Sequence, residues 1–214
     1  MSVQLLVLAA IAIFLVLRLR SVLGTREGFE KPVERNVEPT TRPEFTVVEG
    51  GLDNDIADHV DPKSASGEAL AHMKDADPSF SVNEFLSGGR QAYEMILMAF
   101  ENGDIQEVRG FLDQDVAEAF DDVIAQRQSQ GFVVDATFYG VREMKLVEAT
   151  FEHSSKNGEI TVSFTGELTS VVKNSDGEVV AGDAKSIKRQ KDVWTFARDF
   201  RSGDPNWQLV ATDG

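Results

Sequence analysis

The sequence predicts an α+β domain in which N-terminal helices pack on a four-stranded antiparallel sheet, preceded by one transmembrane helix and a disordered linker. Three observations lead to this fold class. The first 17 residues are almost uninterruptedly apolar, apolar residues recur with helical spacing between about residues 80 and 130, and they alternate with polar residues after Gly131. Helices followed by a run of hairpin strands are typical of α+β domains.

Composition limits what this domain does. The chain has 214 residues, room for one domain with attachments, and its 42% apolar residues include fourteen Phe and two Trp, enough for a core. It has no Cys, which excludes disulfides, thiolate metal sites and Cys nucleophiles. The net charge is −15, and residues 1–26 contain three Arg and no acid, so the rest carries −15 − 3 = −18. Such an acidic body repels phosphates, and we expect no nucleic-acid binding.

Residues 1–23 are predicted to form a transmembrane anchor. Residues 3–17 are apolar except for Gln4, and residues 3–23 as a helix would be about 31 Å long, close to the roughly 30 Å of a hydrocarbon core. Positive residues follow the span, which predicts that the body lies in the cytoplasm. A cleaved signal peptide and a soluble core helix are the alternatives. The anchor residues are Val3, Leu5, Leu8, Ile11, Phe14, Leu17, Arg18 and Arg20, and the residues expected at anionic lipid headgroups are Arg18, Arg20 and Arg26.

Residues 24–78 are predicted to be a flexible acidic linker. They contain five of the six prolines, many acids and few large apolar residues, a composition that cannot offset the entropy of ordering. Its aspartates between residues 53 and 61 lack the Gly and the distal Glu of a calcium loop, so we expect no metal there. The apolar exceptions, which are either a docking segment or a local turn, are Phe45, Val47, Val48 and Ile56.

The folded domain is predicted to comprise residues 79–214 and to begin with two helices. Apolar residues on one stripe indicate a helix over residues 90–101. Gly88 and Gly89 are expected to separate it from a shorter helix that carries Phe85 and Leu86.

Two further helices are expected before the sheet. Asp104 and Glu107 have the spacing of a capping box for a third helix, whose apolar residues are Ile105, Val108, Phe111 and Leu112. A fourth helix is expected over residues 115–130, with Gly131 as its C-cap.

The sheet is indicated by alternation and by turn dipeptides. Ile160, Val162, Phe164 and Leu168 alternate with Ser and Thr, which predicts a half-buried strand. Asn157-Gly158 and Asp176-Gly177 are expected to form hairpin turns. Later strands are expected over residues 192–200 and 207–211.

Enzyme motifs are absent from the sequence, whereas aromatic residues suggest a binding pocket. There is no phosphate-binding glycine loop, no Gly-x-Ser-x-Gly elbow and no His-Glu-x-x-His helix. The predicted sheet faces few helices, and it carries more large aromatic residues than so thin a core needs. Some of them are therefore expected to line a concave apolar pocket. For each residue the alternative is ordinary core packing. Trp194 is expected at the pocket, and Trp207 and Phe196 mainly in the core. The candidate pocket residues are Trp194, Phe196, Arg198, Phe164, Phe120 and Ile124.

Several stretches resemble one domain family, the C-terminal domain of the forty-four-kilodalton scaffold subunit of the translocase of the inner mitochondrial membrane. They are residues 85–94, 102–104, 138–140, 192–199 and 204–212, with Trp194, Arg198 and Trp207 as the most specific positions. The resemblance implies a cone-like fold of the nuclear transport factor type with a hydrophobic pocket, and an adaptor role near a protein-translocation apparatus. The chain lacks an Arg-rich presequence and a long chaperone-binding region, so it looks like a bacterial, membrane-anchored member.

The predicted function is therefore a non-enzymatic adaptor or scaffold at the bacterial inner membrane, with its domain in the cytoplasm and no cofactor. Its pocket or sheet would hold a protein or lipid partner. The alternative is a small-molecule-binding or isomerase-like enzyme on the same fold. An enzyme would need an acid or a base with a displaced pKa in its pocket.

Overall fold

The computed structural model describes residues 53–213. The predicted anchor, its arginines and the first part of the predicted linker lie outside these residues. Within residues 53–213, no helix combines the length and the apolar character needed to span a bilayer.

The described residues form helices first and strands afterwards, in the order that the sequence predicts. The helices are α2 (Asn54–Ala57), α3 (Ala65–Ala76), α4 (Val82–Asn102), the 3-10 turn η1 (Arg109–Phe111) and α5 (Gln114–Ser129). The strands are β1 (Val133–Glu152), β2 (Asn157–Lys173), β3 (Val179–Gly182), β4 (Lys188–Asp199) and β5 (Gln208–Asp213).

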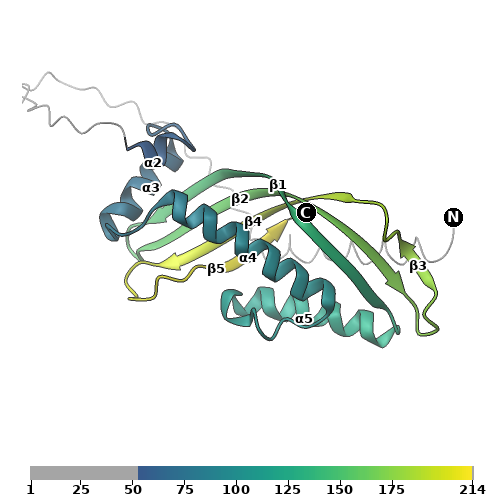
Figure 1. Cartoon of the computed structure of the whole chain (residues 1–214). Helices are drawn as coiled ribbons and strands as arrows, with labels where there is room; N and C mark the ends of the chain where they lie inside the picture. Colours follow the sequence, from purple (N-terminus) through teal and green to yellow (C-terminus); the bar gives the residue numbers. More distant parts are fainter. Residues whose placement is uncertain (1–52, 214) are drawn as a thin grey trace, which may run out of the picture.

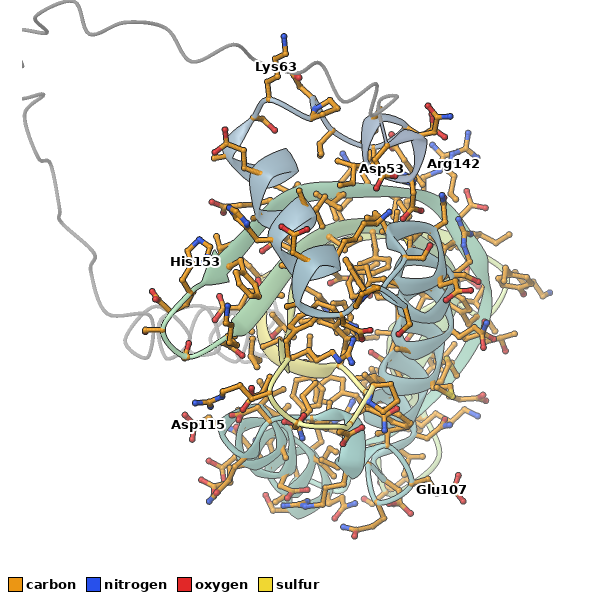
Figure 2. The ribbon with its side chains drawn as sticks, turned by 90° about the vertical axis from the view of Figure 1, so that its left-hand side faces the viewer. Asp53, Lys63, Glu107, Asp115, Arg142 and His153 are labelled. Atoms are coloured by element: carbon orange, nitrogen blue, oxygen red, sulfur yellow. The ribbon has the colours of Figure 1, made fainter. Side chains whose placement is uncertain are left out.

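All strand pairs are antiparallel, and the strand order is β1-β2-β4-β5. Helices α4 and α5 lie along one face of the curved sheet (Figure 1), and the sheet arches over them (Figure 2). The α+β class is thereby confirmed. The expected count of four strands was one too low, because β3 pairs with β2 across the Asp176-Gly177 turn, where Gly177 has φ 80°.

The core lies between the helices and the concave face of the sheet. In β2, Ile160, Val162 and Phe164 are buried against the helices, and the intervening Thr161 and Ser163 face the other side. This alternation follows from the two-residue period of a strand and is the pattern predicted from the sequence.

Helix α4 is continuous, contrary to the expectation of two helices separated at Gly88 and Gly89. A glycine inside a helix costs only about 1 kcal/mol relative to alanine. The burial of Phe85, Leu86 and Tyr93 along the same helix outweighs that cost.

The prediction of a helix after Asp104 is wrong, whereas the prediction of the following helix is confirmed. The Asp104 side chain accepts a hydrogen bond from the backbone N–H of Gln106 at 3.0 Å, which makes a local turn instead of a capping box. Between α4 and α5, only η1 is helical. Helix α5 ends at Ser129 with Gln130 as its C-cap, one residue before the predicted C-cap Gly131, whose φ of 70° is the left-handed conformation that follows many helix ends.

Nearly half of the predicted linker, residues 53–78, is folded onto the domain. Ile56, Leu70 and Met73 of α2 and α3 belong to the hydrophobic core. Ser64 caps α3 by accepting from the backbone N–H of Gly67 at 3.1 Å. The boundary expected at residue 78 thus lies inside the folded part. Helix α3 carries only a short apolar stripe, and this stripe is buried because α3 packs on the sheet.

The Asn157-Gly158 pair does not form the turn between β1 and β2. Both residues already belong to β2, and the turn precedes them. A Cβ on Gly158 would lie 2.7 Å from Phe200 Cε2 and 2.9 Å from Met73 Cε. Glycine is needed here for the close packing of α3 and the β4–β5 loop on the sheet, a requirement that a turn signal does not reveal.

Candidate functional site

The main candidate site is an open pocket of 470 Å³ between α4, the end of β4 and the loop that leads into β5. We call it the apolar pocket. Its aromatic lining is Phe80, Phe85, Phe111, Phe196 and Trp207, and Met95 and Ala92 add aliphatic surface. Met95 is 46% exposed and Phe111 is 36% exposed, so apolar side chains form part of its mouth.

The aromatic wall is held by ring contacts. The Trp207 ring lies 4.7 Å from that of Phe85 and 5.8 Å from that of Phe80, between centroids. Phe85 also makes an edge-to-face contact with Phe196 at 5.9 Å. Such pairs contribute about 0.5–1.5 kcal/mol each beyond area burial. The wall is therefore a fixed surface of the folded domain.

Gly88 and Gly89 make the floor of the apolar pocket. Both line it, and a Cβ built on either glycine would meet no heavy atom within 4 Å. Their lack of side chains therefore leaves space instead of allowing close packing. The sequence signal was present, but it indicated a helix break.

Arg198 joins the two loops that border the apolar pocket. Its Nη2 donates to Asp77 Oδ2 at 2.8 Å, its Nε donates to the Asp204 carbonyl at 3.1 Å, and its guanidinium lies 4.6 Å from the Phe200 ring centre. The hydroxyl and backbone N–H of Ser79, together with Arg198, lower the pKa of Asp77. The Arg198 side chain is only 9% exposed, and it connects the loop that contains Asp77 with the loop that contains Asp204.

The α2–α3 segment (residues 53–77) reaches the same region through Asp55. The Asp55 carboxylate accepts from the backbone N–H groups of Val82 and Asn83 at 2.8 and 2.9 Å, and Lys74 Nζ lies 2.8 Å from its Oδ2. Burial alone would raise the pKa of Asp55, but the bonds from Lys74, Asn83 and Val82 outweigh it and hold the pKa well below its usual range. The segment thus caps the N-terminus of α4, next to the Ser81 edge of the apolar pocket.

The structure brings only two of the predicted pocket residues to the apolar pocket, Phe196 and Arg198. Trp194 and Phe164 are core residues, 4% and 1% exposed, and do not line it. Trp207, which was expected mainly in the core, lines the pocket instead. The difference arises from what covers each ring: Tyr93 covers Trp194, whereas the glycines of α4 lie beside the pocket.

Phe120 and Ile124 also lie away from the apolar pocket. Both are on α5, where Phe120 contacts Phe100 of α4 with 4.7 Å between ring centroids, and Ile124 is 7% exposed. They attach α5 to α4. The residues missed by sequence reasoning are Gly88, Gly89, Phe85 and Met95, which share the face of α4 that turns toward β5.

A polar pair, the buried Tyr93 and the half-buried Asp192, lies beside the core aromatics. Tyr93 is stacked on Phe164, with 4.4 Å between ring centroids, and donates its hydroxyl proton to Asp192 Oδ2 at 2.5 Å. Burial raises the pKa of Asp192, against the lowering effect of its bonds from Tyr93 and Gln190. A Cβ on Gly166 would lie 2.9 Å from the Tyr93 hydroxyl, so glycine makes room for this pair. Neither Tyr93 nor Asp192 lines the apolar pocket.

Metal binding receives no support from the part of the chain that the structure describes. Residues 53–213 contain no group of three or more His, Asp or Glu side chains placed to hold an ion.

The family model described as the Tim44-like domain matches residues 66–214, which confirms the resemblance seen in the sequence. The mitochondrial import inner membrane translocase subunit TIM44 of Mus musculus is 24% identical over 151 residues, 69% of this chain and 33% of that protein. The probable subunit tin-44 of Caenorhabditis elegans is 24% identical over 147 residues, 67% of this chain and 34% of that protein. This chain spans about a third of the length of these relatives.

Among solved structures, the intermembrane space region of the chloroplast protein ARC6 is similar with a TM-score of 0.38 and 15% identity. The match covers 56% of this chain and 85% of that one.

Proposed function

Since this chain belongs to the Tim44-like domain family, we propose that it is a non-enzymatic adaptor whose apolar pocket holds an apolar segment of a protein partner. Residues 1–23 anchor it in the bacterial inner membrane, with the domain in the cytoplasm and Arg18, Arg20 and Arg26 at the lipid headgroups. The names of the relatives describe subunits of a protein translocase. A role in protein translocation or membrane-protein assembly is the corresponding proposal for this chain.

One observation carries the adaptor proposal: the 470 Å³ pocket is lined mainly by aromatic and aliphatic side chains. Surfaces of this kind in concave sites are typical of ligand or partner binding. The flexible Met95 at the mouth suits an apolar segment of variable shape.

The Asp77 carboxyl at the apolar pocket fits binding better than catalysis. Arg198 and Ser79 hold the Asp77 carboxyl ionised, because they lower its pKa. A general acid at neutral pH needs the opposite shift.

The arch of the sheet over α4 supports the proposed cone-like architecture of the nuclear transport factor type (Figure 2).

The second candidate function is a small-molecule-binding or isomerase-like enzyme. The observation that favours it is the Tyr93–Asp192 pair, since a half-buried carboxyl with a raised pKa is a feature of many active sites. Replacing Asp192 by Asn distinguishes the two functions. The adaptor proposal expects partner capture to be unchanged, whereas an active site at this pair would lose its activity.

The pocket is tested by filling it. Leucine at position 88 puts a side chain into the space above the α4 floor without a clash at its Cβ. We expect Gly88→Leu to abolish crosslinking of a partner to a photoreactive residue at position 95, in full-length protein in intact cells, while the melting temperature is kept.

The matched control is Ser87→Leu, an exposed position on the same helix that does not line the apolar pocket. It adds the same surface and should leave the crosslinked product intact. Equal crosslinking in the Gly88→Leu and unmodified proteins would show that the pocket is not the partner site.

The anchor is tested separately by carbonate extraction and by protease treatment from either side of the membrane. We expect the chain to stay with the membrane and its domain to be cut only after the cytoplasmic face is opened. A mature N-terminus near Thr25 would replace the anchor by a cleaved signal.

A further inference from the structure

We propose that the convex face of the sheet, on the side away from the apolar pocket, binds an extended acidic segment of a partner protein as an added strand. The site is a basic strip formed by Arg142, Lys145, Arg189 and Lys191. This inference is independent of the apolar pocket and of what that pocket binds.

The basic strip contrasts with the charge of the chain. In a protein of net charge −15, the stretch from Lys185 to Lys191 contains Lys185, Lys188, Arg189 and Lys191 and no acid. All four of these side chains are exposed. Positive charge concentrated in this way attracts a negatively charged partner, and the acidic remainder of the surface repels it.

The register of the sheet places the strip on the convex face. Trp194 and Phe196 of β4 are buried against the helices, so Arg189 and Lys191 point to the opposite face. Lys145 of β1 lies opposite Ser163 of β2, another residue of that face. Arg142 lies on the outer side of the arch in Figure 2.

Only part of the positive charge is neutralised within the domain. Glu167 Oε1 accepts from both Arg142 Nη1 at 3.2 Å and Arg189 Nε at 3.1 Å, and Glu143 pairs with Lys145 at 2.6 Å. Lys191 makes no ion pair with any of the described residues. One carboxylate shared by two guanidiniums leaves both with unused donors.

The surface beside Lys191 is hollowed. A shallow groove of 410 Å³ is lined by Ser163, Thr165, Lys145, Lys191 and Val193, together with Phe164 and the acids Glu143, Asp192 and Asp213. Val193 is 36% exposed. Of these acids, Glu143 is paired with Lys145 and Asp192 accepts from Tyr93, so the groove offers hydroxyl groups, one apolar contact and Lys191, with Asp213 at its β5 end.

Next to this groove the sheet has an open edge. Strand β5 pairs with β4 only from Val193 to Ala197, and Figure 1 shows β5 ending near the middle of the long strands. Among residues 53–213, the part of β4 from Lys188 to Asp192 pairs only with β2. Its outer edge has backbone groups for one more strand, and adding a peptide strand to an exposed edge is a common mode of recognition.

These features define the occupant. A strand added beside β4 places every second side chain over the convex face, so acids at positions i and i+2 lie across from Arg189 and Lys191. An open edge and a narrow groove suit a chain with its own backbone donors and acceptors. A lipid headgroup, by contrast, cannot form the ladder of backbone hydrogen bonds that the open edge offers.

The test uses the full-length chain in neutral detergent micelles and a fluorescent peptide of alternating Glu and Thr. We expect anisotropy to show binding that weakens as salt is raised. Arg189→Glu combined with Lys191→Glu should weaken it at least tenfold, with the melting temperature kept. The same peptide with N-methyl groups on alternate backbone nitrogens should bind at least tenfold more weakly, because it cannot pair with the edge.

The matched control variant is Lys63→Glu combined with Arg201→Glu, with the same charge change at exposed positions outside the strip. Lys63 points away from the body of the domain (Figure 2). Equal weakening in both double variants, or equal binding of the N-methylated peptide, overturns the proposal. Vesicles of phosphatidylcholine and phosphatidylglycerol give the other arm: strip-dependent vesicle binding without peptide binding would assign the strip to a lipid surface.

Discussion

Two aromatic clusters of similar composition lie under the same sheet, and one is closed while the other is open. Around Trp194, the rings of Tyr93 and Phe164 lie 4.8 and 5.9 Å away between centroids, and Trp194 is 4% exposed. Around Trp207, the rings of Phe80 and Phe85 are as near, yet this cluster borders a 470 Å³ pocket.

Helix α4 accounts for the difference between the clusters. It presents Tyr93 to the first cluster and Gly88 with Gly89 to the second. A large side chain fills the space between helix and sheet, and two glycines leave it empty. The number of aromatic residues therefore does not distinguish the core from the pocket; the residues on the covering helix do.

The largest expected effect is the loss of Trp194. We expect Trp194→Ala to lower the free energy of unfolding by about 3–5 kcal/mol, because it opens a cavity in a closed cluster. Trp207→Ala should cost about 1–2 kcal/mol, since that ring is already partly exposed and its loss extends an existing space. Urea unfolding of both variants measures the difference. Equal losses would mean that the two clusters are energetically alike.

The second effect concerns how the open cluster is held at one end. Asp55→Ala removes the acceptor of two backbone N–H groups of α4 and a partner of Lys74, and we expect it to cost about 2–3 kcal/mol. The α2–α3 segment should then be cut first in limited proteolysis.

Asp53→Ala is the control for this position. Asp53 also bonds Lys74, at 2.7 Å, but makes no bond to α4. The variant should cost clearly less. If both cost the same, the lysine pair, and not the cap on α4, fastens the segment.

The sheet was predictable from the sequence, whereas the covering of its two ends was not. The alternation in β2 predicts a strand, and the residues around Trp194 and Trp207 resemble a known family. Both signals depend only on positions that are neighbours in the sequence. The cap of Asp55 on α4 joins residues 27 and 28 positions apart, and no local pattern announces such a bond.

The same limit applies to the candidate site. Trp194 and Trp207 look equivalent as sequence, and Gly88-Gly89 has the pattern of a helix break. Only the docking of α4 on the sheet decides which tryptophan is covered and turns the two glycines into a pocket floor. Arg198 was found as a candidate because it lies among aromatics, but its bond to Asp77 again joins distant parts of the chain.

The third effect is the pH dependence of stability, which should differ between Asp192, beside the closed cluster, and Asp55, which caps α4 at the end of the open cluster. The pKa of Asp55 is lowered, so its contribution to stability is present above its ordinary value of 3.8 and is lost as the pH falls toward the folded-state value. The pKa of Asp192 is raised, so its contribution is full below 3.8 and is lost as the pH rises through the folded-state value.

The two amide variants should therefore respond to pH in opposite ways. Asp55→Asn should cost most near neutral pH and least in acid. Asp192→Asn, which keeps an acceptor for Tyr93 without a half-buried charge, should gain about 1–2 kcal/mol near pH 8 and nothing near pH 3. Urea midpoints between pH 3 and 8 measure both. Parallel curves would show that the two carboxylates do not differ in environment.

The smallest effect is also the one that best distinguishes a binding pocket from a packing defect. Gly88 is exposed in the middle of α4 and has open space at its Cβ, so Gly88→Ala should stabilise the domain by about 0.5–1 kcal/mol through helix propensity alone. If the open cluster were merely incomplete packing, this variant would be better folded and otherwise unchanged. If the glycine floor makes room for a partner, the added methyl group should weaken capture even though it raises the urea midpoint. Both quantities are measured on the same preparation. A gain in stability together with a loss of crosslinking at position 95 cannot be explained by a change in folding. A gain in both stability and crosslinking would assign the open cluster to packing.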